Sequence, residues 1–347
     1  MKFSKIIIFV LLLLISFNSF AQKKKKKTKK APKNIELIET KFSFTPIYVK
    51  EYSYLHIKSR EHDGASNLKY KPNIIGSVGG KITIKNFTLS YVHALPQPKE
   101  FGKTKASNFI FNLQKRTFGL QMFWIRYNGL YLDTLDRYGI FDDMKKQGID
   151  NAFILRPDMK LNNIGFQTNF ITNKQYSLNA AFEQTERQKK SMGAFMILTG
   201  LNFKSISTNK FNSLIIKSQQ QFFPLTSNLS KLRTISFKPA PGMGYSFIIK
   251  KYFSISGMLH AGPNFQLKWF KLDNEIFTRF RPWLSFYYGA KMAIGYNGKH
   301  FMANIVYSRS EDIIGFRKYY KSPILDCKTN FKYYREFLKL SIGFRIY

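Results

Sequence analysis

Residues 282–296 read PWLSFYYGAKMAIGY and show the pattern on which the fold prediction rests. Every second residue of this stretch is apolar, and the residues between are mostly small or polar. The apolar set is Leu284, Phe286, Tyr288, Ala290, Met292, Ile294 and Tyr296. The other set is Trp283, Ser285, Tyr287, Gly289, Lys291, Ala293 and Gly295. Because successive side chains of a strand point to opposite faces, the stretch predicts a long strand with one apolar face.

The same alternation recurs over most of the chain after residue 40, and Phe and Tyr contribute 35 and 20 residues to the sequence. At the C-terminal end, Leu338, Leu340, Ile342, Phe344 and Ile346 alternate with Lys339, Ser341, Gly343 and Arg345. A strand that crosses a bilayer needs about ten residues with one apolar face, and lipid forces all backbone groups to pair. Soluble sandwiches also alternate, but their strands average about 5–6 residues. We therefore expect residues 41–347 to form an all-β fold, a transmembrane antiparallel up-and-down β-barrel.

Short and long connections alternate between the predicted strands, as in barrels with short turns at one end and longer loops at the other. The count is about fourteen strands if residues 211–220 form one, and twelve if that stretch and one neighbour do not. The stretch 176–183 is among the predicted strands, and Gly79-Gly80 is a predicted tight turn. The longest predicted loop, 129–157, contains five aspartates. We expect it to be solvated, although clustered oxygens also suit a divalent cation.

The first 21 residues are typical of a secretory signal peptide. A basic start precedes the apolar run 6–15, and the small residues Ser19 and Ala21 fit cleavage after Ala21. The apolar run is too short to span a bilayer. Residues 22–40 include the run KKKKKTKK, and so polar a segment is expected to be a disordered periplasmic tail.

The chain is strongly basic, with a formal net charge of +36, and its first 33 residues hold ten lysines and no acid. Such a charge usually suggests nucleic acid as a partner, but an exported chain rarely meets it. We expect outer-membrane lipids and lipopolysaccharide as partners, small anionic solutes as a further class, and the cell outer membrane as the location. Cys327 is the only cysteine, which excludes an intramolecular disulfide and a Cys-based metal site. No cofactor or metal motif occurs in the sequence.

Five blocks of sequence, in the same order, are similar to a known family. They are Tyr70-Lys71-Pro72-Asn73 with Gly76 and Gly79-Gly80, Leu155-Arg156-Pro157-Asp158 with Gln188-Lys189-Lys190-Ser191, Pro241-Gly242-Met243-Gly244-Tyr245, Arg281-Pro282 with Gly295-Tyr296-Asn297, and Gly343-Phe344-Arg345. Over roughly residues 45–347 the chain resembles a family of Bacteroidetes outer-membrane β-barrel proteins, described as a domain of unknown function. The resemblance implies the fold and the location, and it implies no activity, substrate or catalytic residue.

Charged residues in the predicted lumen phase are the candidate functional residues. Lys291, Lys339 and Arg345 lie in that phase, with Glu183 and Arg281 nearby in phase or at the rim. Because rings of charge set ion selectivity in pores, the positive excess predicts a passive, porin-like pore that prefers anions. The alternative is that the same charges brace a narrow barrel. The chain would then be a non-conducting envelope protein that engages lipopolysaccharide or other anionic surface polymers.

Catalytic residues are not expected. The five histidines are scattered, with no pair at the spacing of a local metal site. His260 shares the predicted lumen face with Ser254 and Ser256, and a Ser-His site can be assembled from residues far apart in sequence. A polar lumen wall explains these three residues more simply, so we expect that the chain is not an enzyme.

Overall fold

The computed structural model describes residues 33–38, 42–60, 67–84, 87–95, 97–98, 101–115, 117–135, 154–209, 212–224, 226–272, 279–318 and 327–346. The chain divides into two units, Met1–Pro32 and Lys33–Tyr347, and only the second contains described residues. The predicted signal peptide 1–21, most of the Lys-rich segment 22–40 and most of the 129–157 connection lie outside the described residues.

Strands make up most of the second unit. In chain order they are β1 (Ile35–Leu37), β2 (Phe42–Arg60), β3 (Asn67–Lys71), β4 (Ser77–Ile84), β5 (Phe87–Ala94), β6 (Lys105–Gln114), β7 (Phe118–Leu135), β8 (Ile154–Ile171), β9 (Glu186–Gln188), β10 (Met192–Ser207), β11 (Leu229–Ile249), β12 (Phe253–Leu272), β13 (Arg279–Asn297), β14 (Phe301–Lys318) and β15 (Cys327–Ile346). The π-helix η2 (Asn179–Glu183) and the 3-10 helix η3 (Lys217–Phe222) lie between strands. Nine of the strands are 16 to 21 residues long, far above the ~5–6 residues usual in soluble proteins.

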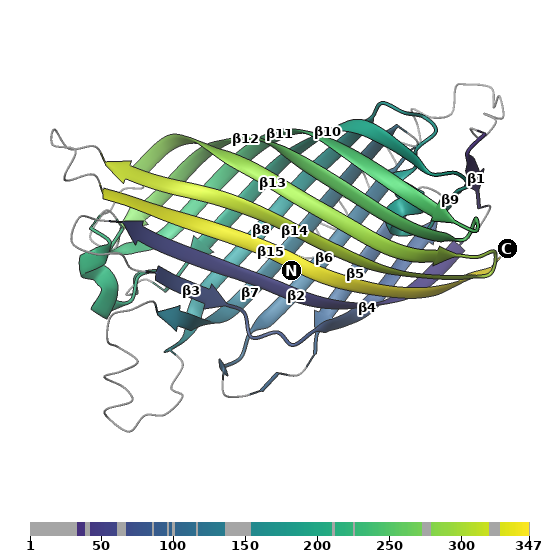
Figure 1. Ribbon diagram of the computed structural model, residues 1–347. Coiled ribbons are helices and arrows are strands. Elements are labelled where there is room, and N and C mark those ends of the chain that lie inside the picture. The colour runs from purple at the N-terminus through teal and green to yellow at the C-terminus, as the bar shows by residue number, and fades with distance from the viewer. Residues whose placement is uncertain are drawn as a thin grey trace, which may run out of the picture. The chain divides into compact units, whose positions relative to one another are not determined.

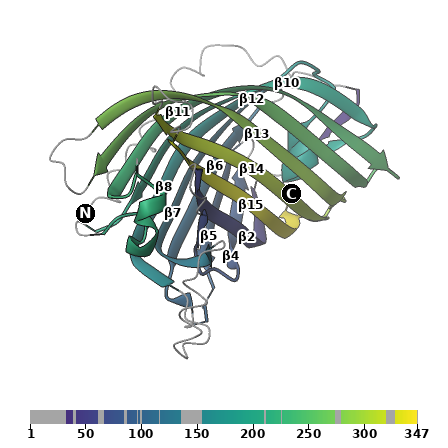
Figure 2. The same ribbon diagram turned by 60° about the vertical axis from the view of Figure 1, so that its left-hand side comes forward.

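Thirteen of these strands form one antiparallel sheet that closes into a ring (Figure 1, Figure 2). The closing pair joins the first and last long strands. β2 pairs with β15 from Phe42 opposite Ile346 to Arg60 opposite Lys328. Closure leaves no long strand of the described chain with an open edge, which is the condition for a sheet in lipid. The antiparallel up-and-down barrel predicted from the alternation is confirmed.

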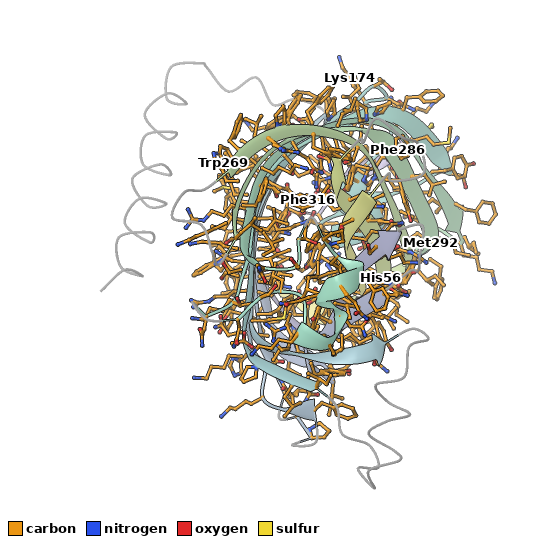
Figure 3. The ribbon with its side chains drawn as sticks, turned by 90° about the vertical axis from the view of Figure 1, so that its left-hand side faces the viewer. His56, Lys174, Trp269, Phe286, Met292 and Phe316 are labelled. Atoms are coloured by element: carbon orange, nitrogen blue, oxygen red, sulfur yellow. The ribbon has the colours of Figure 1, made fainter. Side chains whose placement is uncertain are left out.

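Side chains alternate between the two faces of the wall as the sequence predicted. In β13, Leu284, Phe286, Met292 and Ile294 are between 58% and 62% exposed. Figure 3 looks along the barrel and shows Phe286 and Met292 on its outside and Phe316 inside. The outer face is therefore apolar over this strand, and the other face belongs to the lumen.

The wall has more strands at one end than at the other. After β2 the chain returns as β3 beside the far half of β2, breaks at residues 72–76, and continues as β4 beside the near half. β3 also pairs with β7, whereas the short hairpin β5–β6 separates β4 from β7. A path around the barrel through β3 crosses ten strands, and a path through β4, β5 and β6 crosses twelve. Twelve is the lower of the two counts expected from the sequence.

Asn73 holds the break between β3 and β4 closed. Its side-chain amide donates to the carbonyl oxygens of Pro98 (2.8 Å) and Gly102 (2.7 Å) in the β5–β6 connection. Its backbone N–H donates to Thr104 Oγ1 (2.8 Å), and Thr104 Oγ1 donates to the carbonyl of Gly129 in β7 (2.7 Å). Asn73 is buried, so this network replaces the strand pairing that the break interrupts.

The segment 172–191, between β8 and β10, fills the lumen at the end of the short turns. It carries η2 and β9, and β9 pairs with β1. Its Tyr176 and Phe182 are buried in one apolar cluster with the lumen side chains Met196 and Val306. We call residues 172–191 together with β1 the inner plug.

A second segment, between β10 and β11, fills the lumen at the opposite end. Its described residues, 212–224 and 226–228, carry η3, and we call them the outer plug. Leu214, Ile215 and Phe223 are at most 1% exposed and belong to a large apolar cluster with lumen residues of the wall. Tyr70 Oη donates to the carbonyl of Leu214 (2.8 Å), which ties the outer plug to β3.

These plugs correct several predictions. The predicted strand 176–183 lies in the inner plug, and the described part of 211–220 lies in the outer plug. Their apolar residues face clusters inside the lumen, whereas a strand would have faced them toward lipid. Gly79-Gly80 lies within β4 and is not a turn. The expected tail 22–40 is ordered at Ile35–Leu37, because β1 pairs with β9.

Replacing Asn73 by alanine removes the two donors that hold the Pro98 and Gly102 carbonyl oxygens. We expect the free energy of unfolding to fall by roughly 1–3 kcal/mol, because each of the two hydrogen bonds contributes about 0.5–1.5 kcal/mol and water can reach the partly buried acceptors. Urea unfolding of the protein refolded in lipid vesicles measures this loss. Asn209→Ala, which removes an exposed amide, is the control. An equal loss in both variants would contradict the role of Asn73.

Candidate functional site in the barrel interior

A cavity of about 200 Å³ lies in the lumen between the inner plug and the apolar cluster of the outer plug. Its wall combines amides and charged groups with apolar side chains such as Leu178, Phe182 and Leu198. The amide side chains, from β6, β7, β8, β10 and η2, are Asn112, Gln121, Asn163, Gln167, Asn169, Asn179 and Asn202. The charged side chains, from β10, β11, β13, β14, β15 and η2, include Lys204, Lys238, Lys291, Asp312, Arg335 and Glu183.

Asp312 is the centre of the first charged cluster. Its Oδ2 accepts hydrogen bonds from the ammonium groups of Lys204 and Lys238, each at 2.7 Å. Its Oδ1 accepts from Asn264 Nδ2, also at 2.7 Å. The four side chains come from β14, β10, β11 and β12, and all are buried. The Asp312 carboxylate therefore links side chains of four strands, and it is the shared counter-ion of two ammonium groups.

Glu183 of η2 is the centre of the second cluster. Its carboxylate lies 3.3 Å from Lys81 Nζ and 3.7 Å from Lys339 Nζ. Lys81 Nζ also donates to the backbone carbonyl of Glu183 (3.0 Å). Lys291 Nζ lies 4.4 Å from the ring centroid of Phe182. Burial alone would raise the pKa of the Glu183 carboxyl, but the three nearby ammonium groups lower it to about 2. The structure thus brings together three of the predicted residues, Lys291, Lys339 and Glu183.

Arg345 binds the inner plug. Its guanidinium donates to the backbone carbonyls of Gln184 and Gly298 and to Asn297 Oδ1 at 2.5 Å. Arg187 of β9 donates to the carbonyl of Asn297 (2.8 Å). These hydrogen bonds hold the inner plug against the ends of β13 and β14.

The last predicted residue, Arg281, is exposed near the far end of β13 and takes no part in these clusters. Lys204, Lys238 and Asp312 are not among the residues predicted from the sequence. A signal for the two lysines does exist, because each occupies a lumen position in a strand whose other face is apolar. Asp312 follows Glu311 in a charged stretch, and only the length of β14 (Phe301–Lys318) places it inside the barrel.

The histidine and serines of the lumen do not form a catalytic pair in the described structure. His260 Nε2 lies 3.2 Å from Tyr287 Oη, while Ser256 shares a hydrogen bond with Ser246 (2.8 Å). In the part of the chain that is described, no group of three His, Cys, Asp or Glu residues is placed to hold a metal ion. The expectation that the chain is not an enzyme stays a prediction.

Fold and site together define a class of protein. It is a closed antiparallel β-barrel with a plug toward each end of its lumen and ionic clusters between the plugs. Residues 35–345 match the family described as Domain of unknown function (DUF4421). The chain belongs to that family. The resemblance seen in the sequence is thereby confirmed, and the Bacteroidetes source stays a prediction. Among the described residues, no helix is both long and apolar enough to cross a bilayer.

The structure is similar to several solved structures at low sequence identity. The outer membrane protease OmpT from Escherichia coli is 9% identical, with 93% of this chain and 99% of that chain covered and a TM-score of 0.39. The toluene transporter TodX of Pseudomonas putida is 7% identical, with 90% of each chain covered and a TM-score of 0.28. Ail, the attachment invasion locus protein of Yersinia pestis, is 11% identical, with 88% of this chain and 99% of that chain covered and a TM-score of 0.17. No curated protein matches the sequence.

Replacing Glu183 by glutamine removes the counter-charge of Lys81 and Lys339 and keeps the side-chain shape. We expect a loss of roughly 3 kcal/mol of unfolding free energy near pH 7, because the Glu183 pKa is lowered from 4.5 to about 2. A lowered pKa stabilises the fold fully above about pH 4.5, and the contribution disappears as the pH falls to about 2. The difference between the two proteins, measured by urea unfolding at each pH, should shrink over that range. A difference that stays constant down to about pH 2 would contradict the paired carboxylate.

Proposed function

We propose that the protein is a closed, non-conducting β-barrel of the bacterial outer membrane that engages lipopolysaccharide or other anionic surface polymers through its outward basic residues. One observation carries the proposal. Plugs fill the lumen toward both of its ends. Lys81 and Arg345 donate to backbone carbonyls of the inner plug, and Arg156 donates to the carbonyl of Ser213 in the outer plug (2.7 Å).

The outward face supports a position in a membrane. On β2, β14 and β15, the outward residues nearest the short turns are apolar, for example Phe44, Ile305 and Leu340. Farther along the same strands the outward residues become tyrosines and charged groups, and Tyr54 stacks on Tyr334 with 4.5 Å between ring centroids. Tyrosine rings at the edge of an apolar band are typical of a membrane–water interface.

The height of the wall supports a barrel that rises above the bilayer. Strands of 16 to 21 residues, at ~3.3 Å per residue and a tilt of about 40°, give a wall roughly 40–50 Å tall. The hydrocarbon core of a bilayer is only about 30 Å thick. Outer-membrane barrels carry their short turns in the periplasm. We therefore assign the end with the inner plug to the periplasm and the end with the outer plug to the outside.

The lumen charges that favoured a pore are engaged in holding the barrel closed. Arg345 donates to the carbonyl of Gln184, and Lys81 donates to the carbonyl of Glu183. At the other end Leu214 and Phe223 are fully buried. An ion would have to displace both plugs to cross. The anion-preferring pore is therefore the second candidate, and the excess of positive charge in the lumen is the observation that favours it.

We expect the purified, refolded protein to give no steady conductance steps in a planar bilayer. Replacing residues 178–188 of the inner plug by a short Gly-Ser linker should leave the barrel non-conducting, because the outer plug still closes it. Replacing residues 214–223 of the outer plug should also leave it non-conducting, because the inner plug still closes it. The double replacement should conduct and prefer anions, because cations outnumber acids in the lumen. Stable steps from the unaltered protein would contradict the closed barrel and support the pore.

Exposed basic residues lie above the apolar band, at the level where lipopolysaccharide phosphates would lie. Lys50 and Lys58 of β2 and Arg309 of β14 are exposed on the outward face. Lys50 Nζ lies 5.4 Å from the ring centroid of Tyr52, so an interfacial aromatic ring and a cation are presented together. A basic residue near an anionic membrane surface contributes about 1 kcal/mol to attraction.

Replacing Lys50, Lys58 and Arg309 by glutamine should weaken binding of fluorescent lipopolysaccharide at least tenfold, because each charge contributes about 1 kcal/mol. Titration of the refolded protein in detergent micelles at about 0.1 M salt measures the affinity. The control variant replaces by glutamine three exposed lysines at the short-turn end, Lys174, Lys189 and Lys190. Equal weakening in both variants would show that net charge, and not this face, governs binding.

A further inference from the structure

The layer of the lumen that surrounds the cavity contains more positive than negative charge. Among the described residues its cations are Lys81, Lys204, Lys238, Lys291, Lys339 and Arg335. Its acids are Glu51, Glu183 and Asp312. Six positive groups against three negative groups leave an excess of three positive charges in the space between the plugs.

The ion pairs already present do not remove this excess. Asp312 is shared by two lysines and Glu183 by two others. Lys291 lines the cavity, and its ammonium has only the Phe182 ring as a close partner among the described residues. One carboxylate, Glu183, therefore faces three ammonium groups, those of Lys81, Lys339 and Lys291. An anion in the cavity would offset the positive charge that remains.

Arg335 is the second cation available to a ligand. Its Nε donates to Glu51 Oε1 (3.2 Å), and its guanidinium lies 5.9 Å and 5.2 Å from the ring centroids of Phe123 and Phe337. Its terminal N–H groups have no hydrogen-bond acceptor in the described part of the chain. The side chain lines the cavity, which leaves a planar pair of donors available to a bound oxyanion.

Two neutral polar atoms of the lining also lack a partner. Asn163 Oδ1 and His260 Nδ1 are buried without a hydrogen bond in the described structure. Asn163 is 4% exposed and His260 is 9% exposed, and both line the cavity. Buried polar groups in native proteins nearly always have a partner, so these atoms indicate a polar occupant that offers both acceptors and a hydroxyl.

We propose that the cavity binds a small phosphate-bearing anion through Lys238, Lys291 and Arg335. A phosphate group has a second pKa of about 6 and carries up to two negative charges near pH 7, which offsets most of the excess. A guanidinium binds two phosphate oxygens at once and an ammonium binds as a compact charge. The cavity of about 200 Å³ is many times larger than the ~10–15 Å³ that a single water needs by the same measure. This size admits inorganic phosphate or the phosphomonoester of a small alcohol.

This inference goes beyond the proposed function and does not depend on it. The face proposed for lipopolysaccharide lies on the outside of the wall, whereas the anion would lie inside the lumen. Failure of phosphate binding would leave the lipopolysaccharide and conductance experiments unaffected, and the reverse also holds.

The test uses the full chain, refolded in detergent in the presence of each salt so that entry precedes closure of the plugs. Thermal unfolding is measured over a range of concentrations of inorganic phosphate and of glycerol 1-phosphate, with sodium chloride at the same ionic strength as the reference. We expect a saturable rise in Tm with phosphate, and a larger rise with glycerol 1-phosphate if the ligand is a monoester. No saturable rise with either, or an equal rise with chloride, would overturn the site.

Variants separate a ligand site from a structural role. Lys291→Met should weaken phosphate binding at least tenfold, because the ammonium group that lines the cavity is lost. Arg335→Lys keeps the charge that faces Glu51 but loses the planar donors, and should also weaken binding at least tenfold. Lys174→Met, on the exposed surface, should leave phosphate binding unchanged. Unchanged phosphate binding in both lumen variants would overturn the proposal.

Discussion

The pairing of β2 with β15 is the constraint on which the rest of the structure depends. Backbone N–H and C=O groups in lipid have no water to bind, so the sheet must close on itself. Once it is closed, each residue of a strand faces either lipid or lumen, and the strict period of two follows from that choice. For this reason the side chains of Phe286 and Tyr287, which are neighbours in sequence, lie on opposite faces of the wall, the first outside and the second in the lumen.

Closure also creates an interior that must be filled. The two ends of the wall differ in strand number, and barrel diameter grows with the number of strands. The twelve-strand end therefore has room for the inner plug with η2 and β1. The ten-strand end is filled by η3 and the apolar cluster around Phe223 and Phe331. Asn73 lies in the break between β3 and β4, where the ten-strand part of the wall adjoins the twelve-strand part. Its hydrogen bonds to the β5–β6 connection keep the wall continuous across this change of width.

Charge in the lumen serves the packing of this interior. Asp312 and Glu183 each hold two lysines from different elements, which fixes distant strands and a plug relative to one another. Pairs of this kind are sensitive to the loss of one partner, because the remaining charge is left buried. The imbalance that remains around Lys291 and Arg335 is unusual for a purely structural core, and it is what distinguishes the cavity from the two apolar clusters.

The sequence by itself determined the fold class and the faces of the long strands, because alternation involves only neighbouring residues. The lumen positions of Lys291, Lys339 and Arg345 followed from it. Only the tertiary structure decided that 176–183 enters the lumen, since apolar residues in a short stretch look the same whether they face lipid or an internal cluster. It also decided that Asp312 meets Lys204 and Lys238, which are 108 and 74 residues away in the chain. Contacts of that kind depend on the register of every intervening strand and on the closure of the ring, and no local pattern encodes either.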